Sequence, residues 1–303
     1  MRFSHYNLIA KEIEKEIKKG AEGIIITHGT DTMHYTSSAL SFILEDCPIP
    51  VILTGAQRSS DRGSSDAKLN LISSCQFIAQ TNFKGVAICM HESMDDDACL
   101  ILPGTKTRKI HSSRRDAFKA INSKPIARVT KQGNIGFIDK LPKDEENKKL
   151  KLRLFKEDIK IGILKSHPNM YAEEVLFYKN YDGLVIEATG LGNLPTTRLD
   201  DETEENENIL AALKKLSKKI PIVLSPQTIF GRLNLNVYSN ELIYKELGIL
   251  GHESDMTTET TFIKLAWLLS NYEKEEIPKL MKQNLKGEIS PRSSFDYLDY
   301  GYS

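Results

Sequence analysis

The chain has 303 residues, which is enough for one large or two ordinary domains with a sizeable core. Apolar residues make up 40% of the sequence and charged residues 27%, the profile of a soluble globular protein. The formal net charge is zero, so the sequence excludes a chain-wide basic field that would hold nucleic acid, although a local basic patch stays possible.

Targeting and redox signals point to the cytoplasm. No stretch approaches the roughly 18 consecutive apolar residues that span a bilayer, and Met1 to Gly20 lacks the apolar centre of a signal peptide. The cysteines form no C-x-x-C pair and lie in or beside apolar segments, so we expect buried, reduced thiols. They are Cys47, Cys75, Cys89 and Cys99.

The first half of the chain alternates strands and helices. Ile9, Ile13 and Ile17 recur at helical spacing before Gly20, and they predict an opening helix. Apolar runs typical of buried parallel strands then alternate with helical patterns, which predicts a parallel sheet covered by helices. We expect strands at 23–27, 49–54 and 85–90, with helices at 32–44 and 66–80.

A second alternation follows an irregular stretch with short strands near 126–129 and 135–138. The charge-dense run PKDEENKKLKLR has no apolar face and is the best linker candidate. We therefore predict two α/β domains, a larger one at 1–140 and a smaller one at 158–303, joined by a linker at 141–157. The expected elements of the second domain are strands at 159–164, 183–187 and 221–224 and helices at 172–178, 204–216, 259–269 and 275–283.

The loop after the first predicted strand has the composition of a binding site. In an open parallel sheet, ligands bind beyond the carboxyl ends of the strands. Gly29 permits close approach of the backbone, Thr30 supplies a hydroxyl and Asp31 a carboxylate. The start of the following helix also favours an anion. The alternative is that Thr30 or Asp31 merely caps this helix.

Two further loops remain ambiguous. The polar loop from Thr54 to Asp61 either lines a site or is simply solvated. The segment from Lys106 to Arg115 carries five basic residues and is either a solvated face or the source of a functional lysine. No metal-binding or nucleotide-binding motif is complete, so we expect neither a metal nor a nucleotide cofactor in this chain.

Several longer strings resemble the asparaginase superfamily. THGTDTMHYTSSALSF at 27–42 is similar to the second signature of that superfamily, and TGAQRSSDRGSSDAKLNL at 54–71 follows at the distance the family shows. The strings HGTDTMHYT, GAQRSSDR and SRRDAF resemble the D subunits of archaeal glutamyl-tRNA(Gln) amidotransferases more than free asparaginases. The resemblance extends through KIHSSRRDAF at 109–118, GLVIEATGLGNLP at 183–195 and GRLNLNVYS at 231–239.

This resemblance implies an asparaginase-like fold and a set of site residues. By position in the family motifs, Thr30, Asp31 and Lys109 would form a catalytic relay. Such a relay is needed because a hydroxyl is a poor nucleophile until a neighbouring base takes its proton. The same motifs imply that Gly29, Thr30, Asp31 and Ala56 bind the substrate and that no metal is used.

The resemblance also implies a reaction and partners. The chain would hydrolyse glutamine or asparagine through an acyl-enzyme. The released ammonia would pass to the E subunit of the amidotransferase, a partner that uses ATP and Mg and binds tRNA(Gln) to convert Glu-tRNA(Gln) to Gln-tRNA(Gln). A homodimer is expected. The alternatives are a stand-alone L-asparaginase and a non-catalytic interaction module.

One family motif does not occur in these 303 residues. The first signature, TGGTIAS or similar, carries the nucleophilic threonine on the first strand of the sheet, and no such string is present. The expectation is an N-terminally truncated chain that lacks that strand and is inactive alone. It would represent an incomplete gene model, one part of a split or decayed gene, or a non-catalytic protein.

Overall fold

A computed structural model describes residues 1–59, 61–139 and 149–293 of the chain. These residues form two compact units, Met1–Leu154 and Phe155–Ser293. Much of the predicted linker at 141–157 lies outside the described residues. Its described part contains strand β10 (Lys151–Leu152), which pairs antiparallel with β2 (Leu44–Glu45) of the first unit. The predicted domain boundaries themselves stay a prediction.

The first unit is built on a six-stranded sheet, and the predicted α/β fold is confirmed. Strands β1, β3 and β4 are parallel, as expected, whereas the pairs β4–β5, β5–β8 and β8–β9 are antiparallel. Residues 92–97 between β4 and β5 are too few for a parallel crossover, so the chain turns back on itself. The strands in spatial order are β1 (Ile24–Thr27), β3 (Pro50–Thr54), β4 (Gly85–His91), β5 (Ala98–Pro103), β8 (Ala127–Thr130) and β9 (Ile135–Phe137).

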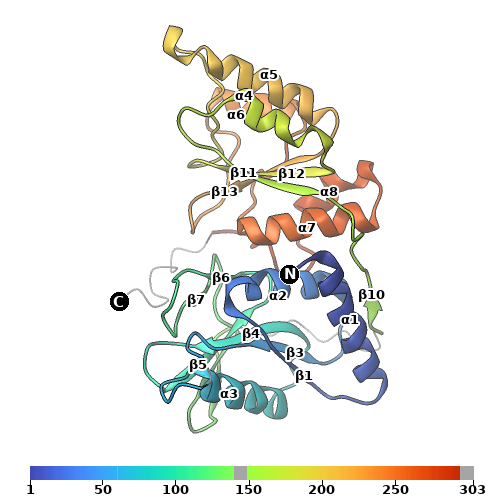
Figure 1. Ribbon diagram of the computed structural model, residues 1–303, viewed down its shortest axis with the longest axis vertical. Helices are drawn as coiled ribbons and strands as arrows, with labels where there is room; N and C mark the ends of the chain where they lie inside the picture. Colours follow the sequence, from blue (N-terminus) through green and yellow to red (C-terminus); the bar gives the residue numbers. More distant parts are fainter. Residues whose placement is uncertain (60, 140–148, 294–303) are drawn as a thin grey trace. The chain divides into compact units, whose positions relative to one another are not determined.

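Helices cover both faces of this sheet (Figure 1). Helix α2 contacts β3 and β4, and α3 lies against the opposite face and contacts β3, β4, β5 and β8. The apolar run Pro50–Thr54 is fully buried because both faces of β3 are covered. The helices of this unit are α1 (Phe3–Lys18), the short 3₁₀ helix η1 (Thr30–Thr32), α2 (Met33–Ile43) and α3 (Ala67–Gln80).

Strand β1 lies at the edge of the sheet. It pairs with β3 on one side, and among the described residues no strand pairs with its other side. Its three isoleucines, at 24–26, are only partly buried. The expectation that a further strand completes this sheet remains a prediction.

A small hairpin is held against α2. Strands β6 (Thr107–Lys109) and β7 (Phe118–Ala120) pair antiparallel, with Lys109 opposite Phe118. Just before β6, the carbonyl oxygen of Gly104 accepts hydrogen bonds from the hydroxyls of Ser37 at 2.7 Å and Ser38 at 3.2 Å. These buried bonds fix where the hairpin leaves the sheet, and therefore where Lys109 lies.

The second unit has three parallel strands between two helical layers, which confirms the predicted second α/β alternation. Helix α7 lies on one face of its sheet, and α4 and α5 lie on the other (Figure 1). Helix α6 was not predicted. The elements are β11 (Ile161–Lys165), α4 (Ala172–Leu176), η2 (Phe177–Asn180), β12 (Gly183–Ala188), η3 (Asp201–Thr203), α5 (Glu205–Ser217), β13 (Ile222–Pro226), α6 (Ser239–Glu246), α7 (Thr258–Asn271), η4 (Lys274–Glu276) and α8 (Ile277–Lys282).

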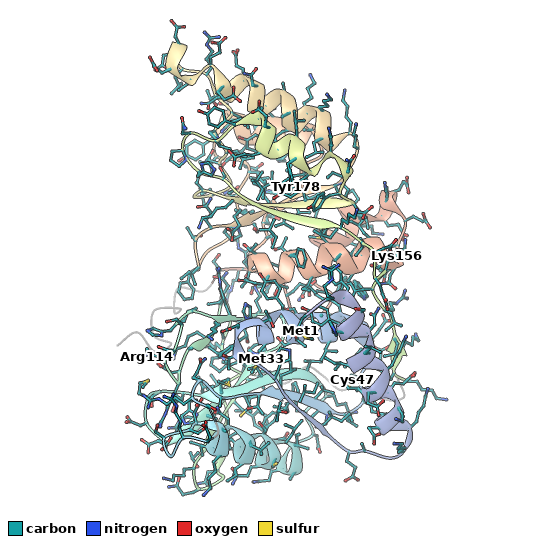
Figure 2. The ribbon with its side chains drawn as sticks, in the orientation of Figure 1. Met1, Met33, Cys47, Arg114, Lys156 and Tyr178 are labelled. Carbon is teal, nitrogen blue, oxygen red and sulfur yellow. The ribbon has the colours of Figure 1, made fainter. Side chains whose placement is uncertain are left out.

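Tyr178 covers the outer strand of this second sheet (Figure 2). Its hydroxyl donates to the carbonyl oxygen of Ile163 at 3.0 Å. Its ring lies so close to Gly162 that a Cβ at that position would collide with it. The aromatic ring therefore packs over Gly162 on one face of this strand, and the hydroxyl binds the carbonyl oxygen of Ile163.

A buried ion pair fastens the end of the second unit to α7. Lys264 Nζ lies 2.6 Å from Glu288 Oε1, and both side chains are fully buried. The same carboxylate accepts the backbone N–H groups of Leu285 and Lys286. Burial lowers the pKa of Lys264, and the opposing charge of Glu288 only partly offsets this effect. The position of the segment after α8 thus depends on the buried ion pair between Lys264 and Glu288.

Replacing Lys264 by methionine should leave the Glu288 carboxylate buried without its cation. We expect Lys264→Met to lower the free energy of unfolding by about 3–5 kcal/mol, measured by urea denaturation. The control is Lys279→Met at an exposed position on α8, which should change stability by less than about 0.5 kcal/mol. Equal stability of the two variants would contradict a structural role for the pair.

Candidate functional site

The candidate site lies at the carboxyl ends of β1 and β3, where the two following loops touch. The backbone N–H of His28 donates to the Thr54 carbonyl oxygen at 2.8 Å, which continues the contact beyond the last strand pair. A Cβ at Gly55 would lie 2.8 Å from Met33 Cε and collide with the carbonyl oxygen of His28. Glycine at position 55 therefore allows the β3 loop to approach the residues that precede Thr30.

Three predicted site residues meet here. Lys109 Nζ donates to the Thr30 hydroxyl at 2.9 Å and to the Asp31 carboxylate at 2.7 Å. The Lys109 side chain is only 10% exposed, whereas that of Asp31 is 93% exposed. The strand end thus supplies the hydroxyl and the carboxylate, and the β6–β7 hairpin supplies the ammonium group.

The side chains of Thr30 and Asp31 do not cap a helix, which was the alternative interpretation of the sequence. The N-cap of η1 is Gly29 and that of α2 is Thr32, and neither helix start has a side-chain cap hydrogen bond. Thr30 and Asp31 are instead bonded to Lys109. Their side chains are therefore available for chemistry at the strand end.

The electrostatics keep the Asp31 carboxylate ionised. Its hydrogen bond with Lys109 lowers the pKa of Asp31, and the positive charge of Lys109 acts in the same direction. An ammonium group that binds a hydroxyl and a carboxylate at once is a connected path for a proton. Asp31 also keeps an exposed negative charge, to which a cationic amino group is attracted.

A hollow of about 330 Å³ lies next to this group of residues. Its volume falls within the range of small-molecule sites. The lining residues are Asp31, His34, Lys109, Ile110, His111 and Ser112.

A buried aspartate holds the loop after β3. The fully buried Asp66 accepts the backbone N–H groups of Gln57 and Arg58 at 3.0 Å and the side-chain amide of Asn70 at 3.2 Å. Ala56, a predicted substrate-binding residue, lies in this held segment between Gly55 and Gln57. Its role in substrate binding stays a prediction.

Gln57 is a site residue that the sequence did not reveal. The Thr30 hydroxyl lies 3.5 Å from Gln57 Oε1, which is longer than an ordinary hydrogen bond but places the amide beside Thr30. The only sequence signal was its position beside Ala56, and nothing in the residue type marked it.

Behind the loop, polar side chains connect three neighbouring turns. His91 contacts Asn70 Oδ1 at 2.6 Å through Nδ1 and Asp96 Oδ1 at 3.1 Å through Nε2. Arg115 in turn donates to Asp96 at 3.0 Å and to the carbonyl oxygen of Ser64 at 2.7 Å. Burial opposes the protonation of His91, but Cys99 and Asp96 outweigh it and raise its pKa. These contacts fix the far end of the β3 loop.

The basic segment from Lys106 to Arg115 is only partly a solvated face. Lys106 is buried, Lys109 lies in the candidate site and Arg115 holds the turns together. Arg114, at the hairpin loop (Figure 2), pairs with Asp116 at 2.8 Å. Of the two interpretations left open by the sequence, the structure favours a lysine with a specific position.

The cysteine prediction is wrong at one position. Cys47, Cys89 and Cys99 are buried, as expected, whereas Cys75 is exposed. On α3 the neighbouring Ser74 and Phe77 face the core, so Cys75 falls on the outward face. All four cysteines are thiols outside any disulfide.

Metal ligands and membrane helices are both missing from the described part of the chain. Within 1–59, 61–139 and 149–293, no group of three or more histidine, cysteine, aspartate or glutamate side chains could hold a metal ion. In the same ranges, every helix is too short or too polar to cross a bilayer. The absence of a resident metal stays a prediction.

Comparison with protein families gives two matches along the chain. Residues 1–142 match the family described as Asparaginase, N-terminal, and residues 160–281 match the Glutaminase/Asparaginase C-terminal domain. Among solved structures, the thermostable L-asparaginase from Thermococcus kodakarensis is 30% identical with a TM-score of 0.84, over 96% of this chain and 83% of that one. L-asparaginase I from Vibrio cholerae is 28% identical with a TM-score of 0.83, over 96% and 82% of the two chains.

The curated relatives are named as components of an amidotransferase. The D subunit of glutamyl-tRNA(Gln) amidotransferase from Methanococcus vannielii is 42% identical over 97% of this chain. The D subunit from Pyrococcus horikoshii is 39% identical over 98%. The chain spans about two thirds of their length, 67% and 65% respectively.

The Lys109 bond to Asp31 can be tested by titration. A carboxyl group whose pKa is depressed on folding contributes stability above its ordinary pKa of about 3.9, and this contribution is lost as the pH falls through the depressed value. In Lys109→Met the Asp31 pKa should rise towards the ordinary value, measured by ¹³C NMR of the carboxyl carbon. Lys68→Met on α3 should leave it unchanged. An Asp31 pKa that is equal in all three proteins would show that the ion pair is absent.

Thiol reactivity should follow the burial of the cysteines. In the native chain we expect a single thiol to react rapidly with Ellman's reagent, because only Cys75 of the four cysteines is exposed. Cys75→Ser should remove that fast phase, and unfolding in urea should release the remaining three thiols. Two or more fast thiols in the native protein would contradict the described packing.

Proposed function

This chain belongs to the asparaginase/glutaminase family, and we propose that it supplies the substrate-holding and proton-relay residues of an amidohydrolase acting on glutamine or asparagine. One observation carries the proposal. A single ammonium group, on Lys109, is hydrogen-bonded to the hydroxyl of Thr30 and to the carboxylate of Asp31 at the carboxyl end of a parallel strand. That position is where open α/β sheets bind their ligands.

The proposed reaction is hydrolysis of a side-chain amide through an acyl-enzyme. This relay requires Lys109 to begin the step as a neutral amine. A hydroxyl nucleophile loses its proton as it attacks the amide carbon, and the proton passes through the Thr30 hydroxyl to the Lys109 amine, which becomes an ammonium group. The C–N bond then breaks, and the nitrogen leaves as ammonia with the returned proton. Water completes the cycle by releasing the free acid. Lys109 and Thr30 thus move protons at two stages, and Asp31 stabilises Lys109 while it carries the proton.

The substrate class follows from the charges at the site. Asparagine and glutamine carry a cationic α-amino group, which the exposed carboxylate of Asp31 would bind. Gly29 and the N–H groups at the start of η1 would face the negative end of the substrate. The hollow beside Lys109, at about 330 Å³, is large enough for a small amino acid.

We further propose that the attacking threonine comes from a segment outside these 303 residues. The TGGT-type signature is absent from the sequence. A strand that pairs with the outer edge of β1 would run past Ile24–Ile26 and end next to Thr30. Such a strand would also cover the partly exposed isoleucines.

The names of the relatives support a role in tRNA-dependent amidation. These relatives are named as D subunits of glutamyl-tRNA(Gln) amidotransferases. We therefore propose that the ammonia serves the conversion of Glu-tRNA(Gln) to Gln-tRNA(Gln). As the family resemblance implies, the E subunit would be the partner and would contribute the tRNA, ATP and Mg sites. A formal net charge of zero fits a chain that leaves most tRNA contact to its partner. A homodimer is part of the same proposal.

A stand-alone L-asparaginase is the second candidate. The observation in its favour is the likeness to L-asparaginases of known structure, at a TM-score of 0.84. The two candidates differ in their dependence on tRNA, since only the amidotransferase would deliver ammonia to Glu-tRNA(Gln).

The test is ammonia release from L-glutamine and L-asparagine by the 303-residue chain, mixed with the part of the M. vannielii relative that it does not match. We expect Thr30→Ala and Lys109→Met each to lower kcat by about 10²–10⁴-fold, the usual contribution of positioned proton transfer. Thr32→Ala is the matched control, because its side chain makes no cap hydrogen bond and its effect should stay within about twofold.

Turnover that survives both Thr30→Ala and Lys109→Met would overturn the relay. Addition of the E subunit, ATP and Glu-tRNA(Gln) then separates the two candidates. Formation of Gln-tRNA(Gln) supports the amidotransferase, and ammonia release without any Gln-tRNA(Gln) supports the free hydrolase.

A further inference from the structure

The side-chain amide of Gln57 lies at the site, and only one of its two polar atoms has a contact there. Its Oε1 atom faces the Thr30 hydroxyl at 3.5 Å. Its Nε2 atom is buried and has no hydrogen-bond partner among the described residues. A buried donor left without an acceptor is destabilising, so this arrangement favours the arrival of an acceptor that the described chain does not supply.

The backbone of Gln57 is fixed, so the amide cannot leave the site easily. Both carboxylate oxygens of the fully buried Asp66 accept its N–H at 3.0 Å, and the next N–H, of Arg58, binds the same carboxylate. Gly55, two residues earlier, is packed against Met33 and Thr30. The loop therefore holds the amide against Thr30 before any ligand binds, which lowers the entropy that binding would lose.

We propose that Gln57 is a ligand-binding residue of this site, whose Nε2 donates a hydrogen bond to a carbonyl or carboxylate oxygen of the bound amino acid. The proposal rests on the amidohydrolase function above, and adds to it a residue that selects for an oxygen acceptor beside Thr30. While Nε2 binds the ligand, Oε1 faces the Thr30 hydroxyl, whose oxygen also lies within hydrogen-bond distance of Lys109 Nζ.

The alternative is that the missing acceptor belongs to protein rather than to ligand. In that case Gln57 would contribute to stability and not to ligand affinity. A methionine replacement distinguishes the two, because methionine keeps the length and flexibility of glutamine but has no N–H donor. The chain offers a matched control in Gln76 on α3, whose Oε1 is also buried without a partner in the described part of the chain and whose amide lies beside Gly133.

The experiment uses the 303-residue chain mixed, as above, with the part of the M. vannielii relative that it does not match. It measures the Kd for L-aspartate and L-glutamate, the reaction products, by isothermal titration calorimetry. We expect Gln57→Met to weaken binding by about 5- to 100-fold, the loss of one buried hydrogen bond. Gln57→Glu should weaken it at least as much, because it lacks the donor and adds a negative charge. Gln76→Met should leave Kd within about twofold.

The outcomes separate this inference from the proposed function. If the parent chain binds and Gln57→Met binds equally well, the assignment of Gln57 is overturned and the amidohydrolase proposal stands. The assignment is also overturned if Gln57→Met lowers Tm while Kd is unchanged, because the acceptor then belongs to the protein. If the mixture with the parent chain binds neither amino acid and releases no ammonia, the proposed function fails, and the role of Gln57 fails with it.

Discussion

The ammonium group of Lys109 is the point on which the candidate site depends. It joins a hydroxyl and a carboxylate that lie 79 and 78 residues earlier in the chain. No local pattern brings such distant groups together, so the tertiary structure has to do so. The hairpin that carries Lys109 is anchored by the serine hydroxyls of α2, which bind the carbonyl oxygen of Gly104. A displacement at Gly104 would therefore reach Thr30 and Asp31 through Lys109.

Around this contact, charged side chains bind backbone groups as well as one another. Asp66 binds the N–H groups of two consecutive loop residues, and Arg115 donates to the carbonyl oxygens of Ser64 and Met94. A buried charge is costly unless its hydrogen-bonding capacity is filled. Loops have many backbone N–H and C=O groups that also need hydrogen-bond partners when they are buried. The charged side chains and the loop backbone groups thus fill one another's hydrogen-bonding capacity. The site is therefore shaped by loop backbone that lies outside the helices and strands.

The sequence predicted the parallel core of both sheets because each strand there is a short apolar run between polar loops. It did not predict β5. The apolar residues of this strand do not specify whether it runs parallel or antiparallel to β4, and the short turn at 92–97 makes it antiparallel. Thr30, Asp31 and Lys109 were predicted from family motifs, whereas composition alone left a helix cap as an alternative. The exposure of Cys75 and the position of Gln57 at the site were not predicted. The first depends on which face of α3 packs against the core, and the second on the orientation of one side-chain amide, and no local sequence pattern encodes either.

The loop after β3 is held through its peptide groups, and this has a consequence for how such a site can change over evolutionary time. Asp66 recognises the main chain at positions 57 and 58, and a peptide N–H is the same for every residue except proline. Side chains in the exposed stretch that includes Arg58, Ser59, Asp61 and Arg62 can therefore be exchanged while the loop keeps its path. Mutations could alter the rim of the site, or the partner that it meets, without disturbing the residues that would carry out the chemistry.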